Sequence, residues 1–116
     1  MANGNNPVNQ DLKQLHGLLV KTNEDLSKKL GTITDPAAAR AVVTEMREVV
    51  HRIDLVQSLL FKAASQGISG AVARVQAANA DLASSIEDIT NLTRFVTTAS
   101  NFLTLVDDAI DLAKTL

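Results

Sequence analysis

Apolar side chains recur at helical spacing near the start of the chain. Steps of three and four residues return a side chain to the same helical face. Asn6 and Pro7 have the order of an N-cap and a first helical residue, and Gly31 is a typical C-terminal stop. The pattern therefore predicts a helix over about 7–30. Its apolar face contains Val8, Leu12, Leu15, Leu19, Leu26 and Leu30.

A second helix begins at the pair Asp35 and Pro36, which again has the order of a cap followed by a first helical residue. One apolar row is expected to be buried: Met46, Val49, Ile53, Val56 and Leu60. A second row widens this face: Val43, Val50 and Leu59. A wide apolar stripe contacts more than one neighbour. We therefore expect this helix to be central and to end near residues 65–67.

The last part of the chain carries an aliphatic residue at every seventh position: Ile68, Val75, Leu82, Ile89, Val96, Leu103 and Ile110. No Gly or Pro follows Gly70. Within this segment, residues 97–101 include Thr, Ser and Asn, which are mediocre helix formers. The unbroken register predicts one long helix over about 70–116, continuous or kinked near 97–101. The alternative is a turn there and a fourth helix.

The predicted fold class is all-α: an antiparallel bundle of three long helices, or otherwise a four-helix bundle. A helix over 70–116 would be near 70 Å long and would extend past a hairpin of two shorter helices. The apolar face beyond that hairpin is wide, and an exposed face of this size is typical of association surfaces. The sequence thus predicts a homodimer or a bound partner helix. The predicted partner-binding residues are Leu92, Phe95, Val96, Ala99, Phe102, Leu103, Val106 and Ile110.

Composition narrows the function classes. The chain of 116 residues is expected to form one domain over 7–116, preceded by a flexible arm over 1–6. Its net charge is −2 and its basic residues are scattered, so we expect no nucleic-acid partner. It contains no Cys, which excludes disulfides and thiolate metal sites. No apolar run reaches the about 20 residues that span a bilayer. A cytoplasmic location is expected.

Three groups of polar residues are candidate metal ligands. Glu48 and His51 have the Glu-x-x-His spacing of di-iron helical bundles, and a dimer would double the motif, with Glu24 or Asp25 added. However, Glu48 and His51 fall on the polar face of their helix, so no bound metal is expected. His16 is expected to be a partly buried structural residue. The acidic cluster Asp107, Asp108 and Asp111 is expected to be solvated.

The sequence contains no phosphate-binding loop and no arrangement typical of nucleophilic catalysis. We therefore expect a non-catalytic protein without a cofactor or a small-molecule substrate, acting through helix–helix self-association or partner binding. An alternative is a dimeric, ferritin-like metal protein with carboxylate and His ligands. A third hypothesis is reversible adsorption of the amphipathic helices to a lipid or apolar surface.

Overall fold

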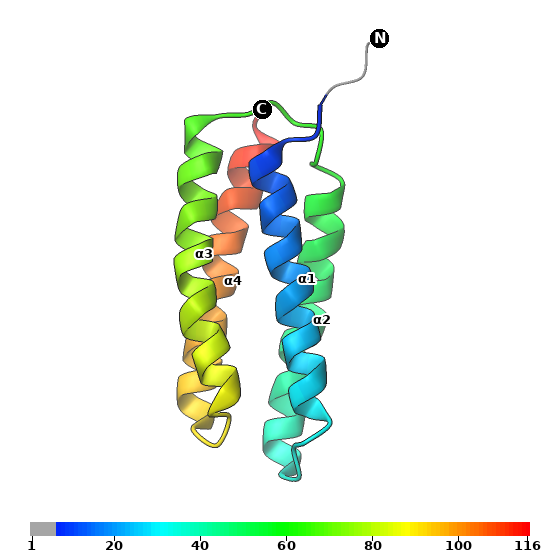
Figure 1. Cartoon of the computed structure of the whole chain (residues 1–116), viewed down its shortest axis with the longest axis vertical. Helices are drawn as coiled ribbons and strands as arrows, with labels where there is room; N and C mark the ends of the chain where they lie inside the picture. Colours follow the sequence, from blue (N-terminus) through cyan, green and yellow to red (C-terminus); the bar gives the residue numbers. More distant parts are fainter. Residues whose placement is uncertain (1–6) are drawn as a thin grey trace.

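The computed structural model describes residues 7–116, and the predicted arm over 1–6 lies outside the described residues. The described chain is all-α, as predicted, and it takes the four-helix alternative (Figure 1). The helices are α1 (Gln10–Leu30), α2 (Pro36–Gln57), α3 (Gln66–Glu87) and α4 (Leu92–Lys114). Each is long enough to run the length of the bundle.

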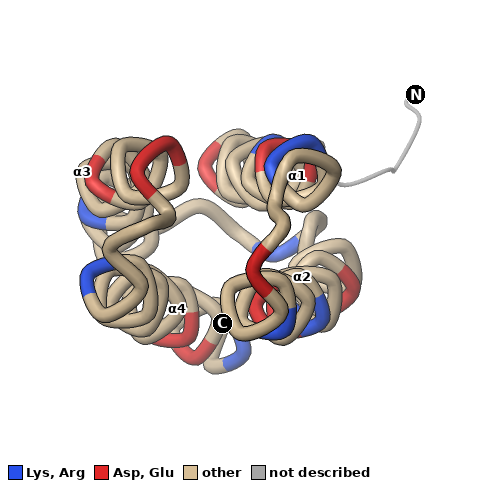
Figure 2. The backbone as a smooth tube through the Cα atoms, turned by 90° about the horizontal axis from the view of Figure 1, so that it is seen from below, with Lys and Arg blue, Asp and Glu red and all other residues tan. Residues whose placement is uncertain are grey.

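The four helices form two antiparallel hairpins that lie side by side. α1 pairs with α2 and α3 pairs with α4, and both hairpin turns lie at the same end (Figure 1). The connection over 58–65 crosses the opposite end diagonally, so α1 neighbours α3 and α2 neighbours α4 (Figures 1 and 2). Most Lys, Arg, Asp and Glu residues lie on the outward sides of the helices (Figure 2). The interior is left to apolar side chains.

One hydrophobic core runs between all four helices, and Phe95 and Phe102 are its largest fully buried side chains. On α2, the buried positions are Ala38, Val42, Val49 and Val56. The prediction that the whole row from Met46 to Leu60 is buried is therefore correct for Val49 and Val56 only. Met46, Ile53 and Leu60 are half-buried, because α2 has neighbours on two sides and this part of its stripe turns toward the surface.

The third predicted helix is not continuous. It ends at Glu87, and a turn over 88–91 leads into α4, where the Asn91 side chain accepts a hydrogen bond from the Arg94 N–H at 3.1 Å. Ile89 lies in this turn and is still buried, so the seven-residue register passes through a break. Beyond the break Val96 is 45% exposed, whereas Leu103 and Ile110 of the same register are buried, so the register describes the core side of α4 only in part.

Residues 97–101, where the sequence predicts a continuous or kinked helix, are helical, and the alternative of a turn there is wrong. The Thr98 hydroxyl bonds to the carbonyl oxygens of Arg94 and Phe95, within its own helix. It also lies 2.6 Å from the Ser85 hydroxyl, which is fully buried on α3. The polar residue therefore joins α3 to α4 instead of interrupting α4.

The helix ends depart from the sequence predictions in several places, and α3 begins at Gln66 and not near residue 70. α1 is capped by Asn9, whose side-chain oxygen accepts from the Asp11 and Leu12 N–H groups, at 3.0 and 3.1 Å. α2 ends at Gln57, well before 65–67, and the connection that follows closes over the start of α1. There the Asn9 side-chain nitrogen donates to the carbonyl oxygens of Lys62 and Ala63, both at 3.1 Å. Asn9 is 4% exposed, so one buried amide both caps a helix and fixes the connection between the hairpins.

Candidate interaction surface

The predicted partner-binding residues lie mainly inside the chain's own core. Six are buried between the four helices: Phe95, Ala99, Phe102, Leu103, Val106 and Ile110. Leu92 is half-buried at the turn end, and only Val96 is exposed. The width of this apolar face is therefore accounted for by α4 folding back on its own chain. Binding of a partner by these residues stays an untested prediction. The apolar face that suggested it is covered by the chain's own helices.

A different apolar surface faces outward, along the groove between α1 and α2. This groove has a volume of about 400 Å³ and is lined by Asn23, Leu30, Val43, Met46, Arg47 and Val50. Val50 is 44% exposed, although valine is usually buried. We call this surface the α1–α2 groove. Val43 and Val50 belong to the second apolar row of α2, and no helix of the described bundle covers them on this side.

Charged residues lie on the same stripe of α2 as the half-buried Val43 and the exposed Val50. Arg40, Arg47 and Asp54 are exposed, and the steps of three and four from Arg40 through Val43, Arg47 and Val50 to Asp54 place all five on one stripe. Among residues 7–116, none of these three charged side chains forms an ion pair. The stripe thus combines apolar contact area with charges of both signs that are available to another molecule.

The groove also contains an acceptor without a donor. The side-chain oxygen of Asn23 on α1 is buried and has no hydrogen-bond partner within the described chain. An unpaired buried amide oxygen costs roughly 1–3 kcal/mol. Its place in the lining of the α1–α2 groove makes it a group that a bound donor can satisfy.

The charges on the α2 side that faces α4 are already paired. Arg52 donates from Nε and Nη2 to the two carboxylate oxygens of Asp107 on α4, at 2.8 and 3.0 Å, and from Nη1 to Glu48 at 3.3 Å. Burial alone would lower the pKa of Arg52, but the hydrogen bonds and charges of Asp107 and Glu48 raise it above its ordinary value. This cluster joins the two hairpins, and each of its three side chains is already hydrogen-bonded within it.

Glu45 is the least satisfied charged residue of the described chain. It lines a narrow space in the bundle with Leu26, Leu82 and Phe102, and its Oε2 atom is buried without a hydrogen-bond partner. Burial and the nearby Glu48 raise the pKa of Glu45, and Arg52 opposes them. The space admits no water-sized sphere, so Glu45 has no room to bind a ligand.

The candidate metal ligands are not brought together. His51 is exposed, Glu48 is held by Arg52, and Asp25 pairs with Lys21 at 2.8 Å. Asp108 and Asp111 are exposed, and His16 is half-buried on α1. Within residues 7–116, no three His, Cys, Asp or Glu side chains lie close enough to share a metal ion.

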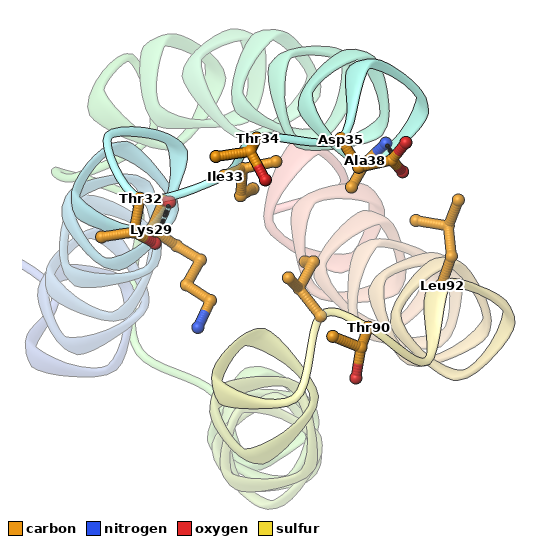
Figure 3. Close-up of a pocket in the computed structure, with 9 residues that line it drawn as sticks. Lys29, Thr32, Ile33, Thr34, Asp35, Ala38, Thr90 and Leu92 are labelled. Carbon is orange, nitrogen blue, oxygen red and sulfur yellow. Dashed lines mark hydrogen bonds between the residues drawn. The ribbon is translucent and has the colours of Figure 1, made fainter.

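Two further hollows lie at the ends of the bundle. The one at the hairpin turns measures about 390 Å³, and Figure 3 shows nine of its residues, with Lys29 and Thr90 on its rim. Its polar groups serve the fold: the Asp35 carboxylate caps α2, and the Lys29 ammonium donates to the Glu87 carbonyl at 3.0 Å. At the other end, Phe61 is 58% exposed beside a hollow of about 590 Å³. That hollow is lined in part by Pro7 and Val8, at the start of the described residues.

The chain matches no protein-family model, no curated protein and no solved structure. Among the described helices, none is both long and apolar enough to cross a membrane. The assignment of the α1–α2 groove as an interaction surface therefore depends on its geometry alone. Sequence reasoning noted its residues Val43 and Val50 but assigned them to a neighbour within the bundle. Arg47 lies between them on the same stripe, and a charged residue in that place indicates that the stripe faces the surface.

Proposed function

We propose that this protein is a non-catalytic interaction module that binds a helix of a partner protein in the α1–α2 groove. The observation that supports this most directly is the exposure of Val50 beside Val43 and Met46, in the lining of the α1–α2 groove. Helix-in-groove recognition uses apolar anchors at spacings of three and four residues. The α2 stripe offers such anchors, flanked by charges that can select an orientation.

The polar groups elsewhere in the described chain favour a binding role over catalysis. Arg52, Asp107 and Glu48 satisfy one another, and Asp35 caps a helix. Glu45 is a half-buried acid with a raised pKa, and no nucleophile or base is among the side chains that share its space. Groups that are already paired for the fold are poorly placed for acid–base or nucleophilic chemistry.

The experiment is photo-cross-linking in the producing cell. A benzophenone amino acid replaces Val50 in the groove or, as a matched control, Ala77, which is exposed on α3. We expect a discrete adduct from position 50 and none from position 77. The proposal would be wrong if position 50 gave no adduct, or if both positions gave the same pattern of adducts.

A further inference from the structure

We infer that the partner helix is α2 of a second copy of this chain, packed antiparallel across the α1–α2 groove. This inference rests on the proposed function and adds the identity of the partner. It places the self-association surface on α2, away from the residues of α4 that the sequence had favoured. The resulting dimer would be isologous, with the same stripe contributed by each copy.

The order of residues along the stripe supports a two-fold arrangement. Arg40 and Asp54 lie the same number of residues before and after Arg47, and they carry opposite charges. In an antiparallel pair centred near Arg47, Arg40 of each copy therefore lies beside Asp54 of the other. The same register brings Val43 to within one residue of the second copy's Val50 along the helix axis. A parallel pair would instead place Arg40 on Arg40 and Asp54 on Asp54, which is a like-charge arrangement.

The second support is that the residues of this stripe are free to contact another molecule. All five residues of the stripe lie on the outer surface or are only half-buried, and the three charged ones form no ion pair within residues 7–116. By contrast, Arg52, one face further round α2, is paired with Asp107 of α4 and so joins the two helices. The unpaired charges are thus the ones that a symmetric contact would pair.

Arg47 is the costly position in this arrangement. The two-fold axis brings the two Arg47 side chains together, and like charges at a contact repel. The unpaired oxygen of Asn23 in the same groove is an acceptor to which a guanidinium can donate. Because repulsion remains and the apolar area is small, we expect a weak dimer, with a dissociation constant of about 10–100 µM. Arg47→Leu should tighten it, because the change removes the repulsion and extends the apolar stripe.

Charge exchange tests the pairing. Sedimentation velocity is measured over a concentration series for the wild type, Arg40→Asp, Asp54→Arg and the double variant. Each single change puts like charges beside each other and should weaken the dimer about tenfold, or 1.4 kcal/mol. The double variant restores opposite charges and should return to near the wild-type affinity. Both substituted positions are exposed in the monomer, and equal melting curves by circular dichroism establish that each variant is folded.

The outcomes separate this inference from the proposed function. A wild type that stays monomeric up to about 1 mM overturns the dimer. A double variant as weak as the single ones overturns the antiparallel pairing. If position 50 cross-links to a protein of another mass and gives no adduct of twice 12.4 kDa, the second copy is wrong and the proposed function stands. If it gives no adduct at all, both are wrong.

Discussion

The two hairpins are built from helices of similar length, yet they use their apolar residues differently. The α3–α4 hairpin buries eight residues of α4 in the core, from Phe95 to Ala113. The α1–α2 hairpin buries only four residues of α2 and leaves Val43 and Val50 in an outward groove. α4 also exposes Val96 and Leu112, but these lie near opposite ends of the helix and share no groove. A wide apolar stripe is therefore fully buried only where all of it faces neighbouring helices, and the side of α2 that carries Val43 and Val50 faces away from them.

The largest effect is expected from a substitution in the part of the core that α4 supplies. Phe102→Ala should lower the free energy of unfolding by about 3–5 kcal/mol, because Phe102 is fully buried at the centre of the core. Chemical denaturation measures the change. The matched surface change, Val50→Ser, should alter stability by less than about 0.5 kcal/mol at concentrations where the chain is monomeric. Similar losses from both changes would show that the two hairpins do not differ as described.

A smaller effect is expected where the hairpins are joined. Asn9→Ala removes the cap of α1 and the two hydrogen bonds to the connection over 58–65, and should cost about 2–3 kcal/mol. Asn9→Ser keeps a capping oxygen and should recover about 1 kcal/mol of that loss. Denaturant titration of both variants checks the difference. A cost below about 0.5 kcal/mol for Asn9→Ala would mean that the buried amide does not hold the connection.

The smallest of these effects concerns Glu45, at the seam between α2 and α4. Its pKa is raised above the unfolded value of 4.5, so ionisation opposes folding. The contribution of this group is fully present below pH 4.5 and is lost as the pH rises through the folded-state pKa. Glu45→Gln should remove this dependence and stabilise the protein at pH 7 by about 1 kcal/mol, a small value because the side chain is only half-buried. Melting at pH 4 and pH 7 tests it, and equal stability of the two proteins at pH 7 would contradict it.

The sequence predicted the first hairpin better than the second because its turn is marked by Gly31, Asp35 and Pro36. The turn over 88–91 has neither Gly nor Pro, and its buried Ile89 preserves the aliphatic register, so the break was missed. Asn91 was the available signal, since Asn is a strong N-cap residue. Continuity through residues 97–101 was predicted correctly, and Thr98 is accommodated there because it finds its hydrogen-bond partners within α4 and on α3.

The candidate surface was harder to predict than the fold. Periodicity shows that Val43 and Val50 share a face, but it does not show on which side of α2 the other helices pack. That depends on the diagonal course of the connection over 58–65, which no local pattern encodes. The Glu48 and His51 pair was correctly assigned to the polar face, and both lie on the outer part of α2.

Single-cysteine cross-linking tests the central claim most directly, because the chain contains no Cys of its own. A short bismaleimide reagent is applied to Arg47→Cys, Arg40→Cys and, as a control on α3, Arg74→Cys. The antiparallel dimer brings position 47 onto its symmetry axis and separates the two copies of position 40 by about 21 Å along the helix. We therefore predict a covalent dimer from position 47 and little from positions 40 and 74. Equal yields at 40 and 47, or no dimer from 47 at concentrations above 100 µM, where a weak dimer forms, would contradict the proposed arrangement.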